Sequence, residues 1–453
     1  MSTEHLSAPA RPVQAPGAAG EPTTPGTMKV SWRGRVALRA GVWAVRASRL
    51  FGFGGGMIGG RVALVVYPGI LRELSAGRRV VLVSGTNGKT TTTALLAAAM
   101  RSAGAVTSNS DGANMLDGVT TALATSKAPT AVVEIDELYL PQAVAQTAPA
   151  VLVLLNLTRD QLDRAGEIRR TAIALRRLAD TFPDLVVVAN CDDPYVVSIA
   201  TSFANVVWVA AGTGLNEDAR TCPHCGHRLS ADDADDLHWQ CTRCGLFRPL
   251  PQWWLSHNEM RSPGGDELGG PLVMYDGSLV PLQVNVPGVV NRANAAMAVA
   301  AAYTLGVAAE KASVALSSVT EAAGRYRTLG VGEHEVQLVL AKNPAGWAAT
   351  LNLVCADRTP VIISINAGEA DGRDTSWLYD VNFDRLRGRL VIASGARAAD
   401  LGVRLSYAGV DHLTIADSPA ALETVPAGPV TLIADYTSFA QLRNTLGALS
   451  DGH

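Results

Sequence analysis

The stretch from Val80 to Thr92 constrains the fold of this chain more than any other part of its sequence. The β-branched run Val80–Val83 predicts a buried parallel strand, and the alanine- and leucine-rich run Thr92–Met100 predicts a helix. A short glycine loop joins them and reads Gly85-Thr86-Asn87-Gly88-Lys89-Thr90. A loop of this kind presents backbone N–H groups and the positive end of a helix to an anion.

The residues of this loop suggest how a nucleoside triphosphate would be bound. Lys89 can reach the terminal phosphates, and the hydroxyl of Thr90 can ligate Mg²⁺. The loop is shorter than the general phosphate-binding pattern, with Ser84 and Gly85 at its start. The alternative is a glycine turn that only closes a strand, but strand, Gly-x-x-Gly-Lys-Thr and helix all agree with phosphate binding.

Length and composition set the broad class. A chain of 453 residues with 48% hydrophobic residues is long and apolar enough for two or three globular domains. The net charge of −3 argues against a broad nucleic-acid footprint, and no charge-free run reaches the length of a membrane span. Residues 1–30 predict a disordered tail, since residues 1–27 are rich in Ala, Pro, Thr and Gly without the layout of a signal peptide. We expect a cytoplasmic protein.

Apolar strands alternate with helical stretches after the loop, which predicts a parallel α/β sheet. Ligand residues should then collect at the carboxyl ends of the strands. Glu134, in a run of three acidic residues with Asp136 and Glu137, is the best placed to hold Mg²⁺ opposite Thr90. Polar groups also follow two later strands, from Asn156 to Arg164 and from Asn190 to Pro194, the second suited to a base or ribose. Taken singly, such residues are more often helix caps or turns.

Four of the six cysteines are clustered in two Cys-x-x-Cys-Gly halves fifteen residues apart, and they are Cys222, Cys225, Cys241 and Cys244. Each half can form a tight knuckle, and two halves make a tetrahedral Zn²⁺ site with four thiolate ligands. Two unrelated reduced pairs are the alternative. Four thiolates leave no open coordination position, so the predicted zinc is structural. The insert spans about residues 216–254, and regular segments resume from Leu272.

The segment from Ser31 to Leu74 mixes arginines with Trp, Val, Ala and Leu. A basic amphipathic helix here could rest on an anionic membrane surface. The competing interpretation, which we favour because glycines from Gly52 to Gly60 break the pattern, is a helix packed on the next domain with solvated arginines.

The rest of the chain predicts a boundary between two domains. Asn291 and Asn294 lie one turn apart on one face of a predicted helix. Gly324-Arg325 precedes a new series of strands, which predicts a larger first domain over residues 31–330 and a smaller α/β domain over residues 331–453.

Together these motifs resemble the Mur ligase family, which joins amino acids to peptidoglycan precursors through an acyl phosphate. The resemblance rests on the glycine loop, Glu134, Asn291 and Asn294, and Gly324-Arg325. It is closer to the MurT family, the ligase-like subunits of lipid II isoglutaminyl synthase, over roughly residues 35–445. The motifs specific to that family are the cysteine ribbon and three runs that begin at Arg159, Lys342 and Ala370.

The resemblance implies a fold, a reaction and a set of ligands. It implies a central phosphate-loop domain with an inserted zinc ribbon and an α/β C-terminal domain. ATP and Mg²⁺ would phosphorylate the α-carboxylate of D-glutamate in the lipid II stem peptide at the inner membrane face, and ammonia would convert it to D-isoglutamine. By resemblance Asn291 and Arg325 would join the loop and Glu134 in binding the nucleotide.

The same resemblance implies a partner, a GatD-like glutaminase that supplies the ammonia and forms a heterodimer with this chain. Asp374 maps onto the residue thought to complete the glutaminase triad from the ligase-like subunit, and a carboxylate that orients a histidine is an ordinary third member. The alternative for Asp374 is a helix cap or Asx-turn. No Cys/His pair here looks like a glutaminase, and Cys355 stands alone in an apolar run.

Two positions depart from the related patterns. Gln161 follows Asp160 where Mur amino-acid ligases usually carry a metal-binding histidine, and Ala367 follows Asn366 where MurT-like chains commonly carry Asp.

Two other functions are weighed against amidation. One is a Mur-type ligase that adds an amino acid, and the other is an ATP-binding scaffold whose ribbon binds nucleic acid, which the acidic insert disfavours.

Overall fold

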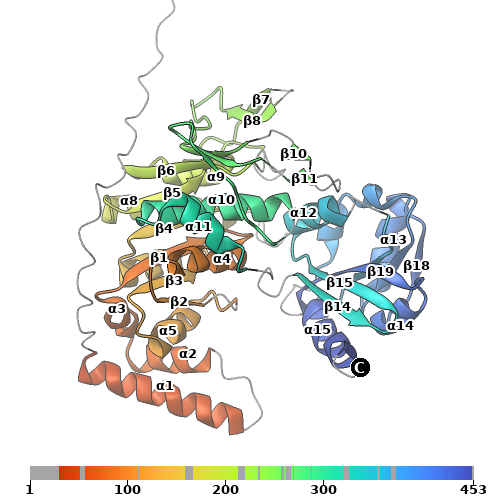
Figure 1. The fold of residues 1–453 in the computed structure, drawn as a ribbon, viewed down its shortest axis with the longest axis horizontal. Helices are drawn as coiled ribbons and strands as arrows, with labels where there is room; N and C mark the ends of the chain where they lie inside the picture. The colour runs from red at the N-terminus through yellow and green to blue at the C-terminus, as the bar shows by residue number, and fades with distance from the viewer. Residues whose placement is uncertain are drawn as a thin grey trace, which may run out of the picture.

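The computed structural model describes residues 30–50, 57–109, 112–158, 167–212, 220–232, 235–256, 260–261, 267–268, 270–286, 288–319, 326–354, 358–368 and 374–450. In Figure 1 the chain divides into a larger N-terminal body and a smaller C-terminal one, with helix α12 between them.

The larger body is built on a sheet whose order within the described residues is β13-β12-β9-β6-β5-β4-β1-β3-β2. From β2 to β9 neighbouring strands run parallel, as predicted, and β12 and β13 add an antiparallel edge that was not predicted. The strands are β1 (Arg79–Ser84), β2 (Val106–Ser108), β3 (Thr130–Glu134), β4 (Val151–Leu154), β5 (Val186–Asn190), β6 (Asn205–Ala210), β9 (Trp253–Leu255), β12 (Leu272–Met274) and β13 (Leu279–Val280).

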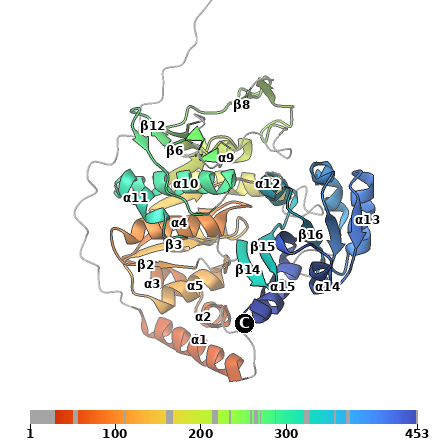
Figure 2. The ribbon, with the colours of Figure 1, turned by 45° about the vertical axis from the view of Figure 1, so that its right-hand side comes forward.

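Helices cover both faces of this sheet because its central strands are apolar on both sides. One face packs against α4 (Lys89–Arg101), α10 (Val289–Thr304) and α11 (Ala309–Leu316). The other carries α2 (Ile58–Val66), α3 (Ile70–Ser75), α5 (Leu116–Thr125), α6 (Leu140–Thr147), α7 (Glu167–Arg176), α8 (Leu178–Thr181) and α9 (Pro194–Ala200), and α1 (Trp32–Leu50) is the outermost element on that side (Figures 1 and 2).

The cysteine-rich segment is an insertion between the neighbouring strands β6 and β9 and projects from the sheet. The chain leaves the sheet after β6 and returns at β9, which pairs parallel with β6, so the sheet resumes before Leu272, where we expected it. The projection holds the hairpin of β7 (Ser230–Asp232) and β8 (Asp235–Gln240), and β10 (Met260–Arg261) and β11 (Glu267–Leu268) form a second small pair.

The C-terminal body has its own sheet, in the order β14-β15-β19-β16-β17-β18 within the described residues. Only the β14–β15 pair is antiparallel there. Its elements are β14 (Tyr326–Val331), β15 (His334–Leu340), α12 (Pro344–Val354), β16 (Val361–Ser364), the 3₁₀ helices η3 (Ser376–Asp380) and η4 (Phe383–Leu386), β17 (Val391–Ser394), α13 (Ala398–Tyr407), β18 (His412–Thr414), α14 (Ser418–Glu423), β19 (Gly428–Ala434) and α15 (Tyr436–Ser450).

Separate apolar cores hold the C-terminal body together. On one face of the sheet, the rings of Trp377 and Phe383 pack against Trp347, with ring centroids 5.9 and 5.7 Å from that of Trp347. On the other face, Phe439 and Leu442 of α15 pack against the sheet.

None of the helices in the described part of the chain has the length and apolar composition that a bilayer-spanning segment requires.

Candidate active site and metal centre

The loop between β1 and α4 has the conformation that its glycines allow. Gly85 and Gly88 have φ angles of 144° and 84°, in the region that favours glycine. A Cβ on Gly85 would lie 2.9 Å from the Cβ of Leu155, and one on Gly88 would lie 2.5 Å from Asn294 Oδ1. Both glycines are therefore required by backbone conformation and by close approach.

Neighbouring residues at the end of β4 hold the loop in place. The Thr86 N–H donates to the carbonyl of Asn156 at 3.0 Å, and the Asn87 N–H donates to Asn156 Oδ1 at 2.8 Å. The Asn156 amide returns a bond to the Asn87 carbonyl, and Thr158 exchanges two bonds with the Thr86 hydroxyl. Asn156 was predicted only as a polar residue at the end of a strand, whereas in the structure its hydrogen bonds to Thr86 and Asn87 fix the conformation of the loop.

Lys89 is the first residue of α4 and is only 6% exposed. Its ammonium donates to the carbonyls of Gly85 and Thr86, at 2.5 and 3.3 Å, and lies 3.2 Å from Glu137 Oε2. The predicted cation therefore lies against the loop itself. The ion pair with Glu137 was missed, and its only signal was the acidic run after β3.

Glu134 and Thr90 provide the oxygen ligands that Mg²⁺ prefers. Glu134 ends β3, is fully buried, and lies in register with Val83 of β1, which leads into the loop. Asn109 accepts from the Glu134 N–H at 2.8 Å and donates to its carbonyl at 3.0 Å, which fixes that strand end. With the buried hydroxyl of Thr90 at the start of α4, the donor set fits the metal.

Two asparagines on α10 bond to each other, and one of them, Asn294, lies against the loop. Asn294 is 6% exposed, its Oδ1 lies against Gly88, and its amide donates to Asn291 Oδ1 at 3.3 Å. The two side chains therefore share one face of the helix, as their spacing predicted.

A residue of the C-terminal body also contacts the loop. Asn343, 1% exposed, donates from Nδ2 to Asn87 Oδ1 at 3.1 Å and accepts from the Gly346 N–H at 2.9 Å. It thus caps the start of α12, where Pro344 is the first helical residue. Asn343 belongs to the run beginning at Lys342 that carries the family resemblance, but its contact with the loop was not predicted; the Asn-Pro start of a helix was its local signal.

The acidic pair after β5 has a structural explanation. Asp193 accepts from the N–H groups of Tyr195 and Val196, capping α9, and from the Leu157 N–H at 3.0 Å. Burial raises the pKa of Asp193 to about 6 despite these three bonds. Asp192, 1% exposed, forms a two-pronged ion pair with Arg248 at 2.7 and 2.9 Å, which ties the cysteine-rich projection to the sheet.

The four clustered cysteines converge as predicted. Their Sγ atoms all lie within 4.8 Å of one another, with Cys222–Cys244 and Cys225–Cys241 separations of 3.4 and 3.5 Å. A disulfide would need about 2.05 Å, whereas Zn–S bonds of about 2.3 Å in a tetrahedron place sulfurs about 3.8 Å apart. The separations therefore suit a shared metal ion.

The backbone of each knuckle supports the same interpretation. Gly226 and Gly245 have φ angles of 71° and 74°, and their N–H groups donate to the carbonyls of Cys222 and Cys241, each at 2.9 Å. Backbone N–H groups of the two turns point at the Cys222 and Cys241 sulfurs, where they would stabilise thiolates.

Comparison with known proteins assigns the family. Residues 83–240 match the model of the Mur ligase middle domain, and residues 340–439 match that of the MurT ligase C-terminal domain. The chain is 30% identical over 435 residues to the lipid II isoglutaminyl synthase (glutamine-hydrolyzing) subunit MurT of Staphylococcus aureus strain COL, covering 90% of this chain and 97% of that protein. The chain belongs to the MurT family.

Other relatives agree with this assignment. The MurT subunit of Streptococcus pneumoniae is 29% identical over 421 residues, covering 87% of this chain and 93% of that one. In fold, the chain is similar to a pseudomurein peptide ligase type C from Methanothermus fervidus, with a TM-score of 0.60, 19% identity, and coverage of 82% and 79%. It is also similar to MurF ligase from Thermotoga maritima in complex with ADP, with a TM-score of 0.58, 15% identity, and coverage of 86% and 84%.

Asp374 lies within the part of the chain that matches the MurT C-terminal domain. Its side chain is exposed, and its Oδ1 accepts from the Ser376 N–H at 2.9 Å just before η3. That bond lowers the pKa of Asp374, so the carboxylate is kept ionised. The local geometry is the Asx-turn that the sequence offered as the alternative for this residue.

Several predicted residues of this MurT-family chain lie outside the described residues. They are Arg325 with Gly324, the run Arg159–Gly166 with Asp160 and Gln161, Cys355, and the start of the run that begins at Ala370. Their predicted roles stay predictions.

Proposed function

We propose that this chain is the synthetase subunit of a glutamine-hydrolysing lipid II isoglutaminyl synthase, a carbon–nitrogen ligase of peptidoglycan biosynthesis. It amidates the α-carboxylate of D-glutamate in the lipid II stem peptide to D-isoglutamine at the expense of ATP. The observation that carries this proposal is the similarity to MurT subunits along nearly the whole chain. The intact phosphate loop supports it, because amidation through an acyl phosphate needs a bound triphosphate.

The loop residues bind and orient ATP. Backbone N–H groups at the start of α4 would face the phosphates, and Lys89 would exchange its bonds to loop carbonyls for bonds to phosphate oxygens. Glu134 and Thr90 are the residues that would hold Mg²⁺, which supplies charge neutralisation to the triphosphate when bound. Asn291 and Arg325 complete the proposed nucleotide contacts.

The reaction then has two displacement steps. A carboxylate oxygen of D-glutamate attacks the γ-phosphorus, and the bond to the β-phosphate oxygen breaks, which gives an acyl phosphate and ADP. Ammonia attacks the acyl carbon, loses a proton, and phosphate leaves with the C–O electron pair. The position of the phosphate loop next to the C-terminal body suits these two steps. Asn343 links the C-terminal body directly to Asn87 of the loop and can help close the site around the substrate.

We infer that ammonia comes from a GatD-like glutaminase in a heterodimer with this chain. MurT relatives carry the word subunit in their names, which supports assembly with another chain. Asp374 is proposed as the third member of the partner's triad, with its exposed carboxylate oriented by the bond from Ser376. We also propose that the four cysteines bind a structural Zn²⁺. We further propose that the reaction takes place at the cytoplasmic membrane face, where lipid II carries its stem peptide.

Trapping the activated carboxylate tests this proposal. The full chain is incubated with ATP, Mg²⁺, lipid II and hydroxylamine, which converts an acyl phosphate to a stable hydroxamate. Lys89→Ala should lose the hydroxamate because the terminal phosphates lose their cation, whereas Lys127→Ala, an exposed lysine elsewhere, should keep it. Hydroxamate formation by Lys89→Ala at the rate of the wild type would refute the assigned site. Incubation with amino acids instead of hydroxylamine tests the Mur-type ligase alternative, which predicts an amino-acid adduct.

A further inference from the structure

The outermost helix of the structure, α1, buries its small residues and exposes its large ones. Gly34, Ala37 and Gly41 are the buried positions, and a Cβ on Gly41 would lie 2.5 Å from the carbonyl oxygen of Gly59 in α2. The close crossing of α1 and α2 therefore depends on glycines. Ser31, just before α1, donates its N–H to Glu73 at 3.0 Å, so α1 is also tied to α3.

The opposite side of α1 carries a stripe of large apolar and basic residues. They recur every three or four positions, which places them on one face of a helix, and they are Trp32, Val36, Arg39, Trp43, Arg46 and Leu50. Trp32, Trp43 and Leu50 are 65%, 69% and 87% exposed. A helix of a globular protein normally has polar residues on its solvent side, so this arrangement needs an explanation.

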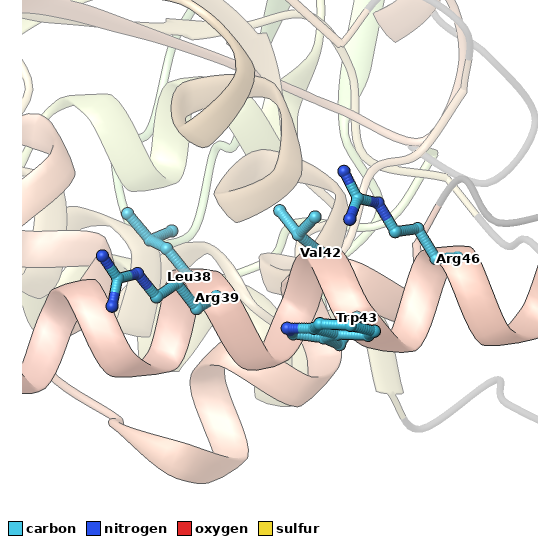
Figure 3. A pocket seen from close by; sticks show the side chains of 5 residues that line it. All are labelled: Leu38, Arg39, Val42, Trp43 and Arg46. Atoms are coloured by element: carbon cyan, nitrogen blue, oxygen red, sulfur yellow. The ribbon is translucent and has the colours of Figure 1, made fainter.

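The arginines of this face have no acidic neighbours along the helices. The sequences of α1 and α2 contain six arginines and no Asp or Glu. Arg33 and Arg46 stack over Trp32 and Trp43, with distances of 5.5 and 5.8 Å to the ring centroids. Figure 3 shows Arg39 and Arg46 on either side of Trp43, around a shallow hollow of about 330 Å³ that Leu38 and Val42 also line.

We propose that α1, with the exposed Val65 and Val66 at the end of α2, is a docking surface for a membrane that carries anionic phospholipid. Trp side chains suit the headgroup level, Leu50 and the valines suit the acyl boundary, and arginines complement phosphate headgroups. In Figures 1 and 2, α1 runs along the outside of the larger body, so its exposed face can lie along a membrane. The sequence-based preference was for a helix packed on the next domain with solvated arginines. The buried face of α1 does pack on α2, and its exposed face carries apolar as well as basic residues.

Packing contacts connect the docking surface to the end of β3, where Glu134 lies. A Cβ on Gly60 of α2 would lie 1.9 Å from the Asp117 carbonyl, so α2 packs directly on α5. Asn109 connects the segment just before α5 to the end of β3. Its side-chain amide donates to the carbonyl of Ala113 and to the carbonyl of Glu134. A membrane bound at α1 would therefore be held by the same body that holds the phosphate loop. Membrane binding itself does not depend on the proposed reaction.

Vesicle flotation of the full chain tests the proposal. We expect binding to vesicles of phosphatidylcholine with phosphatidylglycerol, weaker binding at high salt, and none to phosphatidylcholine alone. Arg39→Gln with Arg46→Gln should lower the partition coefficient roughly 30-fold, at roughly fivefold for each basic residue. Trp32→Ala with Trp43→Ala should lower it on the order of tenfold or more, because buried aromatic area is lost.

Matched control variants test whether vesicle binding depends on this surface or only on the number of exposed basic and apolar residues. Arg101→Gln with Arg170→Gln removes two exposed arginines elsewhere, and Tyr407→Ala with Leu413→Ala removes exposed apolar groups of the C-terminal body; both pairs should bind like the wild type. Circular dichroism and ATP binding verify that the α1 variants remain folded. The proposal is overturned if anionic vesicles do not bind the wild type, if the α1 variants bind equally well, or if the stripe instead mediates self-association that the tryptophan variants abolish.

Discussion

Gly88→Ala probes the phosphate loop at the point where backbone conformation and packing coincide. The alanine would have to adopt a φ of 84°, and its Cβ would lie 2.5 Å from Asn294 Oδ1. The left-handed conformation costs roughly 1–2 kcal/mol for a residue with a Cβ. Moving the Asn294 side chain away gives up its bond to Asn291, at about 0.5–1.5 kcal/mol.

The two terms together stabilise a relaxed loop, which does not bind phosphate, by about 1.5–3.5 kcal/mol relative to the competent loop. ATP then binds only the minor competent conformation, so its apparent dissociation constant should rise roughly 10- to 400-fold. Isothermal titration calorimetry measures this directly. Gly104→Ala is the matched control, because a Cβ there meets nothing within 4 Å and its φ is outside the left-handed region.

A double-mutant cycle separates the two causes. Asn294→Ala removes the atom that the new Cβ would strike but leaves the backbone strain, so the double variant should lose about 1 kcal/mol less than the sum of the single variants. ATP binding by Gly88→Ala at the affinity of the Gly104→Ala control would refute the reasoning for this loop.

Three further predictions concern the metal, the partner and pH. Cys222→Ser should lose bound zinc, measured by atomic absorption, and a few kcal/mol or more of unfolding free energy, while ATP binding persists; an equally stable zinc-free variant would contradict a structural metal. Asp374→Asn should keep amidation with free ammonia but lower glutamine-dependent amidation by roughly 10³–10⁴-fold, and equal loss of both would indicate a structural role. Because burial raises the pKa of Asp193 to about 6, the folded state binds more protons than the unfolded state between about pH 4 and 6. The Asp193 contribution to stability is therefore present at low pH and lost as pH rises through about 6, and Asp193→Asn should flatten that slope in denaturant unfolding; an unchanged slope would contradict it.

Local patterns in the sequence predicted the features that depend on local spacing. The strand, glycines and Lys89 specify the loop, and the two Cys-x-x-Cys-Gly halves specify four converging thiols, because each forms within a few bonded residues. The alternation of apolar strands with helices likewise predicted the parallel core of the larger sheet.

Contacts across long sequence separations could not be predicted in this way. Asn343 bonds to Asn87 across 256 residues, and only the packing of two bodies brings them together. The run Asn190–Pro194 looked suited to a base or ribose at a strand end, with a helix cap as the commoner alternative, and the carboxylate of Asp193 does cap α9. Periodicity on α1 showed an amphipathic helix but not that its large residues face outward, which follows from the glycine crossing with α2.

Amidation of lipid II is the most direct test of the central claim. The chain is incubated with ATP, Mg²⁺ and lipid II, first alone with ammonium or glutamine, and then as a complex with a candidate GatD-like glutaminase, and the product is identified by mass spectrometry. The account predicts amidated lipid II from the lone chain with ammonium, and from glutamine only in the complex. Absence of amidation with every ammonia source, despite ATP binding, would contradict it.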